Sequence, residues 1–228
     1  MKQSDPHAGL DAFLTRYPVK TFKKGEIILF QGEAPRSTYV VKSGIIKSYN
    51  ISVSGDEKPV GYIVHHEIFP APWTFQKAPS ALYYYEAFMD AELYVVPREE
   101  YIAFLKSSPE LLFSELEHYV GVQLGTAMRL NALQHSRASD KLIYTLHYLA
   151  LTHGRPVDTG VVEVSLNLTH QDFANLTGLT RETTATELNK LKTAGIISYG
   201  KHTLYQVDVA KLNHVLNDQF IAELEITL

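Results

Sequence analysis

The 228-residue chain contains no cysteine and only 1 tryptophan. Without cysteine, it can form no disulfide bond, no cysteine-held iron–sulfur cluster and no thiol redox switch. It also lacks an apolar run of about 18 residues, the length that a membrane-spanning helix needs. Its first residues, MKQSDPHAGLDAF, contain no apolar signal-peptide core. We therefore expect a cytoplasmic protein without a membrane segment.

A surplus of positive charge is absent as well. The net charge is −4, and residues 139–207 carry six Lys or Arg against six Asp or Glu. If the chain binds nucleic acid, its positive charge must therefore be concentrated on one face. Hydrophobic residues make up 45% of the chain, which is enough for a real core. The length suits two modest domains.

The most informative stretch is residues 168–197, LTHQDFANLTGLTRETTATELNKLKTAGII. Thr169, with Asp172 three residues later, predicts the capped start of one helix. Gly178 allows a sharp turn, and Thr180 then predicts the cap of a second helix. Two short helices joined by a glycine turn are typical of a helix-turn-helix, although an ordinary pair of antiparallel helices shows the same features.

The residues after the second helix favour DNA binding. Gly195 suits the end of that helix. Residues 196–199 and 203–207 alternate loosely between apolar and polar, with Gly200 and Lys201 at a turn between them. This pattern predicts a β-hairpin, the wing of a winged helix. We therefore expect a winged helix-turn-helix whose second helix enters the major groove.

Three segments resemble one family of regulators: TRET at 180–183, ELNKL at 187–191 and GII at 195–197. The chain is similar there to the recognition helix of the cyclic-AMP receptor protein/FNR family of bacterial transcription regulators. The resemblance implies that Arg181 and Glu182 read base edges. Relatives often carry a second arginine where this chain has Thr186, so the base pair facing Thr186 should be read weakly. The residues that we expect on the DNA backbone are Thr169, Thr180, Thr183, Thr184 and Lys201.

The first half of the chain has the sequence pattern of a β-roll. Short strand-like segments follow one another from Val19 to Pro97 with glycine turns between them. The motifs KGE, QGE and KSG resemble, in that order, the effector-binding roll of the same family. We predict an α+β protein with a β-roll sensor domain at 1–108, a dimerisation helix at 109–137 and a winged helix-turn-helix domain at 138–228.

Residues 68–86 are where the family's cyclic-nucleotide members bind phosphate with an arginine. This chain has no arginine between Arg36 and Arg98, and Lys77 is the only cation in the stretch. Cyclic AMP is therefore not the expected ligand. The aromatic residues there can line a pocket for a less charged effector or simply fill the roll: Trp73, Phe75, Tyr83, Tyr84 and Tyr85.

No metal or cofactor site is expected. His65 and His66 are adjacent, and on a strand their rings would point to opposite faces. No further histidine or carboxylate cluster stands at ligand spacing.

A long helix without proline is predicted from Glu110 to Gln134, following Pro109. An apolar stripe with 4-3 spacing runs along it and predicts a dimer contact: Leu112, Leu116, Tyr119, Gln123, Thr126, Leu130 and Leu133. Further apolar residues, Leu111, Phe113, Val120, Leu124 and Met128, widen this face, so the helix can also cover the roll.

Shorter elements complete the prediction. We expect helices at 9–17 and 98–107, a hinge at 137–140 with Ser139 or Asp140 capping a helix at 141–153, and a strand at 161–168. Residues 154–156, Gly-Arg-Pro, should end the helix at 141–153. A final helix should run from Asp208 to about Leu224, with Phe220 on its apolar side.

These features together predict a homodimeric transcription regulator. Its expected partners are palindromic double-stranded DNA, a second copy of the chain, RNA polymerase and an unidentified small-molecule effector. Two alternatives remain: a regulator that needs no effector, and an enzyme that uses the winged helix for protein contacts. The chain shows no nucleophile motif and no paired carboxylates in a loop, which disfavours the enzyme.

Overall fold

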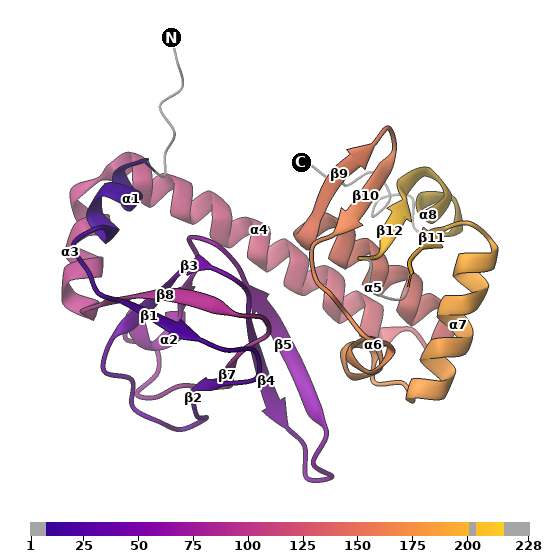
Figure 1. Ribbon diagram of the computed structural model, residues 1–228, viewed down its shortest axis with the longest axis horizontal. Coiled ribbons are helices and arrows are strands. Elements are labelled where there is room, and N and C mark those ends of the chain that lie inside the picture. Colours follow the sequence, from indigo (N-terminus) through magenta and orange to yellow (C-terminus); the bar gives the residue numbers. More distant parts are fainter. Residues whose placement is uncertain (1–7, 201–203, 217–228) are drawn as a thin grey trace. The chain divides into compact units, whose positions relative to one another are not determined.

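The computed structural model describes residues 8–200 and 204–216. The chain divides into two compact units, Met1–Glu117 and His118–Leu228 (Figure 1). The boundary falls inside one long helix, α4, which spans Pro109–Gln134. In the described part of the chain, no helix is both long and apolar enough to cross a membrane.

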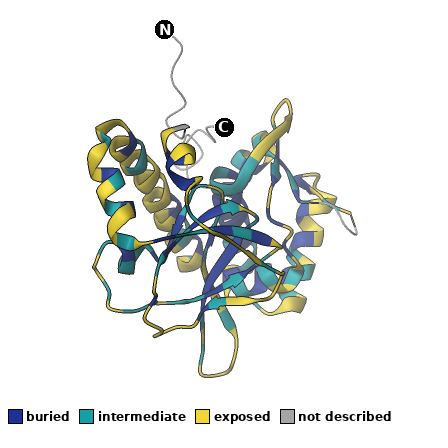
Figure 2. Ribbon diagram, turned by 60° about the vertical axis from the view of Figure 1, so that its left-hand side comes forward, coloured by how far each residue is buried: buried dark blue, intermediate teal, exposed yellow. Residues whose placement is uncertain are grey.

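The first unit is a β-roll of two four-stranded antiparallel sheets. One sheet has the order β1-β8-β3-β6 and the other has the order β2-β7-β4-β5. Their bounds are β1 Val19–Phe22, β2 Ile27–Leu29, β3 Thr38–Ser43, β4 Ile46–Ile51, β5 Glu57–Ile63, β6 Ile68–Phe69, β7 Tyr84–Ala87 and β8 Ala91–Val96. The predicted roll is confirmed, and Figure 2 shows that buried residues concentrate in its strands.

Strand alternation gives the roll two apolar cores. Val41 of β3 lies between the two sheets, in a cluster that also contains Phe69 and Tyr85. Its neighbour Val40 points to the other side, since successive side chains on a strand face opposite ways. Val40 packs in a second cluster with residues of the helices, such as Tyr101.

Three helices supply the outer wall of that second core. They are α1 Ala8–Leu14, α3 Arg98–Ser107 and the first turn of α4. The prediction for residues 98–107 is confirmed, whereas α1 ends three residues before the predicted 17. A short helix, α2 Ala71–Thr74, lies between β6 and β7.

His65 and His66 do not lie on a strand, so the reasoning from strand alternation was wrong. They form a turn in which His66 has a φ of 69° and the two ring centroids are 3.6 Å apart. His66 Nε2 lies 2.8 Å from an Asp11 carboxylate oxygen. No group of three or more metal-ligand side chains occurs within residues 8–200 and 204–216.

The second unit is built on α5, Ala138–His153. Nine consecutive residues of α5, 142–150, are buried, so the helix is surrounded on all sides. Around it lie α6 His170–Thr177, α7 Arg181–Thr193, α8 Val209–Val215 and a four-stranded sheet of order β11-β12-β10-β9. The strands are β9 Gly154–Asp158, β10 Val161–Val164, β11 Ile197–Ser198 and β12 Gln206–Asp208.

The predicted helix-turn-helix and wing are confirmed. β11 pairs antiparallel with β12, with Ile197 opposite Val207. The predicted turn residue Lys201 lies outside the described residues. The predicted continuous helix from Asp208 to about Leu224 is wrong, because α8 ends at Val215 and Leu216 is extended. Phe220 lies outside the described residues.

Two details of this unit were predicted wrongly. Helix α5 begins at Ala138, with Arg137 as a cap residue that makes no side-chain bond, and Ser139 instead donates to the Asp140 carboxylate at 3.1 Å. Residues 154–156 do not merely end α5 but begin strand β9.

Candidate DNA-binding surface

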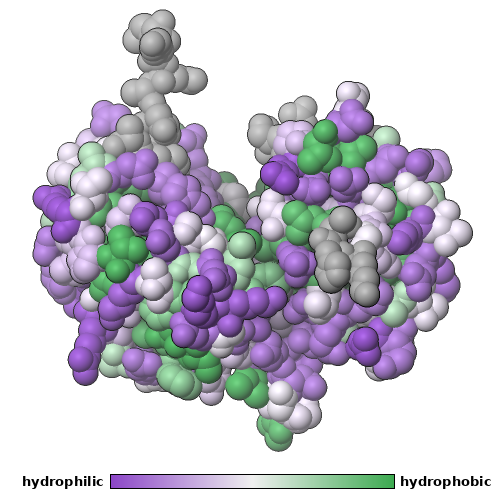
Figure 3. Space-filling view, in the orientation of Figure 1, coloured by the Kyte–Doolittle hydropathy of each residue, from purple (hydrophilic) through white to green (hydrophobic). Residues whose placement is uncertain are grey.

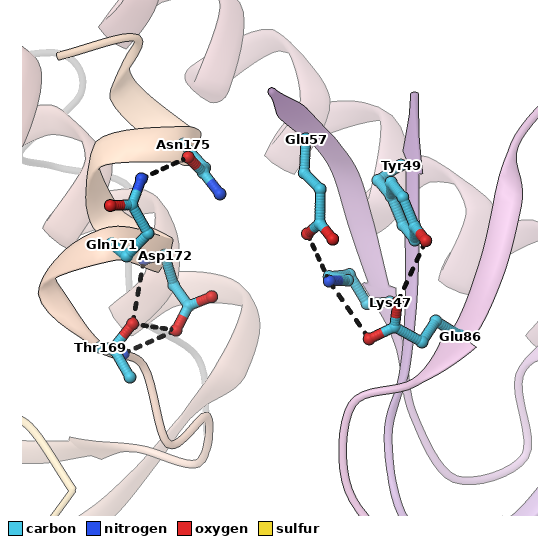
Figure 4. Close-up of polar contacts among 8 residues, drawn as sticks. All are labelled: Lys47, Tyr49, Glu57, Glu86, Thr169, Gln171, Asp172 and Asn175. Atoms are coloured by element: carbon cyan, nitrogen blue, oxygen red, sulfur yellow. Dashed lines mark hydrogen bonds and ion pairs between the residues drawn. The ribbon is translucent and has the colours of Figure 1, made fainter. Parts of the chain in front are cut away.

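The first helix of the helix-turn-helix is fixed by its own capping residues. The Thr169 hydroxyl accepts a bond from the backbone N–H of Asp172 at 3.2 Å. The Asp172 carboxylate accepts in return from the Thr169 backbone N–H at 2.7 Å and from its hydroxyl at 2.6 Å. Gln171 donates to Asn175 one turn later at 2.9 Å (Figure 4). The predicted capping box is therefore present, and it sets where α6 begins.

The turn between the two helices depends on Gly178. This residue has a φ of 68°, and its N–H donates to the Ala174 carbonyl. Leu179, which is half-buried, also donates its N–H to Ala174, at 3.2 Å. Thr180 then caps α7 by accepting from the backbone N–H of Thr183 at 3.2 Å.

The capped start of α7 exposes the predicted base readers. Arg181 and Glu182 are the first two residues of the helix, and both are exposed. Within the described part of the chain, the Arg181 guanidinium has no hydrogen-bond partner. Its five donors therefore remain available for an external acceptor.

Thr186 is exposed one turn along, but its hydroxyl is already engaged. It donates to the Glu182 carbonyl at 3.0 Å. A threonine that bonds back to its own helix presents its methyl group and one acceptor lone pair outward. Thr186 therefore has no hydroxyl proton left to donate to a base.

The predicted backbone-contact threonines differ in what they can donate. Thr169 gives its hydroxyl proton to Asp172, and Thr180 gives its own to the Thr183 oxygen at 3.0 Å. Thr183 is half-buried, and its hydroxyl proton is left for an outside acceptor.

Thr184 does not fit its predicted role. Its side chain is fully buried, so it cannot reach a phosphate. Thr184, Leu188 and Leu191 are all buried and follow one another at spacings of four and three, which puts them on the inner face of α7. Lys201, the predicted wing contact, lies outside the described residues.

A contact that the sequence did not suggest ties the wing to α7. Lys192 donates to the Tyr199 carbonyl at 2.8 Å, and its ammonium lies 4.2 Å from the centre of the Tyr199 ring. The Tyr199 hydroxyl donates to Asn189 at 3.3 Å. Lys190 forms an ion pair with Glu187 at 2.7 Å. Both lysines of this turn of α7 therefore already have a partner within the protein.

His170 lies at the edge of the same surface and was also missed. It is the first residue of α6, and its ring meets the edge of the Tyr199 ring with centroids 5.9 Å apart. Burial lowers the pKa of His170, and the nearby Arg181 charge lowers it further. The available signal was its place directly after the cap residue Thr169.

The predicted dimer stripe on α4 is exposed along its length. Leu116 and Leu130 are each 57% exposed, and Leu112, Tyr119 and Leu133 are exposed as well. Gln123 and Thr126 complete the stripe and are also exposed. Leu111 and Met128 are buried as expected, whereas Phe113, Val120 and Leu124, which were thought to widen a covered face, are exposed. Elsewhere, the face of the molecule in Figure 3 is mainly hydrophilic, with separate apolar patches.

The five aromatics of the predicted effector pocket do not line one cavity. Tyr85 is 3% exposed and stacks on Phe69 between the sheets, with Tyr83 against its edge. Tyr84 points to the opposite face and stacks on Tyr49 at 5.3 Å.

The other two predicted pocket aromatics lie beside the helices. Phe75 packs against the cluster that includes α1 and α3. Trp73 lies beneath the Arg98 guanidinium at 4.7 Å. A shallow cavity of about 250 Å³ borders α3, and none of the five aromatics lines it.

The outer face of the second sheet carries a buried charge cluster that the sequence reasoning missed. The Lys47 ammonium lies 2.6 Å from Glu57 and 3.3 Å from Glu86, although its side chain is only 7% exposed (Figure 4). Tyr49 donates its hydroxyl to Glu86 at 3.1 Å. Burial and the Glu86 charge raise the pKa of Tyr49, so its hydroxyl stays protonated and keeps donating.

Comparisons with known proteins match both parts of the chain. Residues 19–108 match the family model of the cyclic nucleotide-binding domain, and residues 140–215 match that of the Crp-like helix-turn-helix domain. A global nitrogen regulator from Nostoc sp. is 28% identical over 184 residues, which cover 80% of this chain and 82% of the relative. The cyclic AMP receptor protein of Thermus thermophilus is 24% identical over 210 residues, covering 90% and 91%.

The fold agrees with solved regulators. A CooA mutant from Carboxydothermus hydrogenoformans superposes with a TM-score of 0.74 at 18% identity, covering 94% of this chain and 96% of that one. A roll of the cyclic nucleotide-binding type and a Crp-like helix-turn-helix in one chain define a DNA-binding transcription regulator. With both domain models matched and relatives aligned over most of its length, this chain belongs to the Crp/Fnr family.

Proposed function

We propose that the chain acts as a homodimer on a two-fold symmetric DNA site, which it reads with the exposed N-terminal turn of α7. The observation that carries this proposal is the pairing of a capped helix start with an unpartnered Arg181 in the described structure. The N-terminal residues of a recognition helix are those that reach base edges in the major groove.

The chemistry of each reader predicts part of the site. The Arg181 guanidinium can pair bidentately with guanine O6 and N7, and Glu182 can accept from cytosine N4. Thr186 offers its methyl group, because its hydroxyl bonds to the Glu182 carbonyl. A threonine methyl in the major groove makes an apolar contact with the thymine methyl. Each half-site should therefore contain a G·C pair and a thymine.

The DNA backbone contacts should position the protein without specifying sequence. Thr183 has the free hydroxyl proton among the capping threonines, so it is the proposed phosphate donor of α7. Thr169 and Thr180 already donate their hydroxyl protons within the helix caps, so neither hydroxyl can donate to a phosphate while its cap is intact. Lys201 of the wing remains a proposal from the sequence alone.

The exposed stripe on α4 supports a second copy of the chain as its partner. Five of its seven members are large apolar side chains left open to solvent. Their 4-3 spacing is that of a two-stranded coiled coil. Two copies of α7 would then bind half-sites about 34 Å apart on one side of the duplex.

We propose that cyclic AMP is not the effector of this roll. Lys77 is the only cation in residues 68–86 and is exposed, so a cyclic phosphate lacks a charge-assisted bidentate partner there. Calorimetry should detect no binding of cyclic AMP, and micromolar binding would contradict the proposal.

A regulator that needs no effector is the second candidate. The packing of Tyr85 on Phe69 between the sheets favours it, because these rings fill the roll. The alternative, an apolar effector, predicts that a small molecule co-purifies with the native protein. Native mass spectrometry separates the two: a stoichiometric adduct supports the effector and argues against the filled roll.

The cytoplasm is the proposed location, because a bacterium's chromosomal DNA lies there. RNA polymerase is the further partner that the family resemblance implies.

Selection of binding sites from a random duplex library tests the proposed docking. The wild type should recover a palindrome, and Arg181→Ala should lose preference at one base pair per half-site at a cost of about 1–3 kcal/mol. Thr186→Val keeps the methyl and should keep the thymine, whereas Thr186→Ser keeps only the hydroxyl and should lose it. A motif without two-fold symmetry, or one unchanged in Arg181→Ala, would contradict the proposal.

A further inference from the structure

We propose that His170 is a DNA phosphate contact that takes up a proton when the protein binds DNA, so that DNA affinity rises as the pH falls through neutrality. This inference rests on the proposed DNA-binding function and adds to it a residue and a mode of regulation. No other histidine of the described chain both follows a helix cap and lies beside a predicted base reader.

The position of His170 makes a phosphate its natural partner. It follows the cap residue Thr169 directly, and in a helix-turn-helix the first helix crosses the DNA backbone. The free N–H groups at the start of α6 favour an anion at this place. His170 is half-buried, so part of the residue remains open to solvent.

Two features hold the ring in place. Its cap residue Thr169 is locked to Asp172, which fixes the first turn of α6. The Tyr199 ring meets it at 86°, and Tyr199 is itself held by Lys192. Ring and backbone therefore reach the DNA already ordered, and little side-chain entropy is lost on contact.

The charges around His170 favour the neutral ring in the free protein. Arg181 on α7 is the charged group that acts on it most directly, and both burial and this charge lower the pKa of His170. Lys192, also on α7, adds a positive charge behind Tyr199. Asp172 on α6 is the nearest carboxylate in sequence, and one of its oxygens, Oδ2, accepts both bonds from Thr169.

The remaining titratable groups around this site are phenols that stay neutral. Burial raises the pKa of Tyr199 and of Tyr205, whose rings are packed together with centroids 4.5 Å apart. They contribute no charge to the site in the physiological range. Arg181 therefore dominates the field at His170 until DNA arrives.

DNA reverses this balance. A phosphate beside the ring favours the imidazolium, and the same duplex engages the Arg181 charge. The pKa of His170 is therefore low in the free protein and higher in the complex, so binding takes up a proton. Affinity should rise as the pH falls through the pKa of the complex and should level off below the pKa of the free protein.

A set of substitutions separates this role from simple packing. His170→Gln keeps a polar side chain but cannot be charged, and His170→Lys is charged throughout. DNA affinity of the full chain should be measured by fluorescence anisotropy between pH 6 and 8 at one salt concentration, because phosphate contacts depend on salt. His214→Gln, on exposed α8, is the matched control.

The expected pattern is a wild-type affinity that meets that of His170→Gln at pH 8 and that of His170→Lys at acidic pH. For one proton per protomer, the slope of the logarithm of wild-type affinity against pH should approach at most about −2 for a dimer. His170→Gln should match the wild type at pH 8 and fall at least about tenfold below it at pH 6, with the slope lost. His170→Lys should bind as tightly as the acidic wild type at every pH, and His214→Gln should keep the wild-type slope.

A second measurement follows the proton itself. Nuclear magnetic resonance titration of the His170 ring should give a higher pKa in the DNA complex than in the free protein. In the free protein, Arg181→Gln should raise that pKa, because it removes the neighbouring charge. An unchanged His170 pKa on DNA binding overturns the proposal, and so does a pH slope that survives in His170→Gln. Failure of the wild type to bind any duplex at any pH contradicts the proposed function as well, whereas binding without this slope contradicts only the role of His170.

Discussion

Gly178→Ala should lower the free energy of unfolding of the second unit by about 1 kcal/mol. Gly178 has a φ of 68°, and no heavy atom lies within 4 Å of the position that a Cβ would take. The substitution therefore meets no steric obstacle and bears only the backbone cost. That cost is about 1–2 kcal/mol for a left-handed L-residue. Alanine also restricts the unfolded chain, which offsets about 0.4–1 kcal/mol of it.

The chain provides a matched control for this prediction. Gly160, in the turn between β9 and β10, has a φ of 72° and is equally open at its Cβ position. Gly160→Ala should therefore lose the same free energy within a few tenths of a kcal/mol, and the double variant should lose the sum, since distant sites add. Gly178→Asn should lose less than either, because asparagine tolerates the left-handed region.

Two assays together test the reasoning. Denaturant unfolding measures the stability loss, and duplex binding measures whether α7 keeps its place. We expect both alanine variants to bind DNA like the wild type, because the Thr180 cap and the bond from Leu179 to Ala174 still hold the turn. A stability loss above about 3 kcal/mol, or none at all, would refute the calculation. A loss of affinity in Gly178→Ala that is absent in Gly160→Ala would show that glycine sets the helix position and not only its stability.

Three further predictions follow from other parts of the structure. Replacing Leu116 and Leu130 with glutamate should convert dimers to monomers in light scattering, whereas glutamate at Leu82, which is 42% exposed and lies outside the stripe, should not. A wild type that is already monomeric at micromolar concentration would contradict the dimer helix. His147 is fully buried and neither ring nitrogen has a partner in the described structure, so His147→Leu should stabilise the protein by about 1–2 kcal/mol at neutral pH. Burial lowers the pKa of His147, so the unfolded chain binds the proton first as the pH falls. Wild-type stability should therefore fall as the pH drops below about 6.5, and His147→Leu should lose less stability over the same range. Parallel pH profiles of stability for the two proteins would count against this explanation. Lys47→Ala removes the cation shared by Glu57 and Glu86 and should lower stability in thermal unfolding by about 2–3 kcal/mol. The double variant Lys47→Ala/Glu86→Gln should regain part of that stability. No recovery would mean that packing and not charge stabilises the cluster.

The features that the sequence predicted well are those with local causes. The helix-turn-helix was predictable because Thr169, Gly178 and Thr180 act within three or four residues of themselves. The roll was recognised from its glycine turns and short strands for the same reason.

Prolines explain two of the missed elements. Pro156 was read only as a helix breaker, yet it lies in β9, an edge strand where a proline N–H is not needed. Pro72 likewise lies in the first turn of α2, where proline is well tolerated. A breaker residue thus says where an element ends but not whether another begins.

The remaining site residues are placed by strand pairing between segments far apart in the sequence. Lys47 meets Glu86 only because β4 pairs with β7, a register that no local pattern specifies. The tyrosines at 83–85 looked like one aromatic group, but alternation along β7 sends Tyr84 and Tyr85 to opposite faces. Thr184, in contrast, could have been placed correctly, because it stands in helical phase with Leu188 and Leu191.

The unit boundary inside α4 bears on how such a protein can be reshuffled during evolution. Domains joined by a flexible loop can be exchanged by recombination at the loop with little effect on either partner. Here a crossover at the boundary between Glu117 and His118 would cut the proposed dimer stripe. Leu112 and Leu116 would come from one parent, and Leu130 and Leu133 from the other. A hybrid regulator would therefore inherit its choice of partner subunit from both parents, and only crossovers that keep the apolar spacing in step would give a chain able to pair with itself.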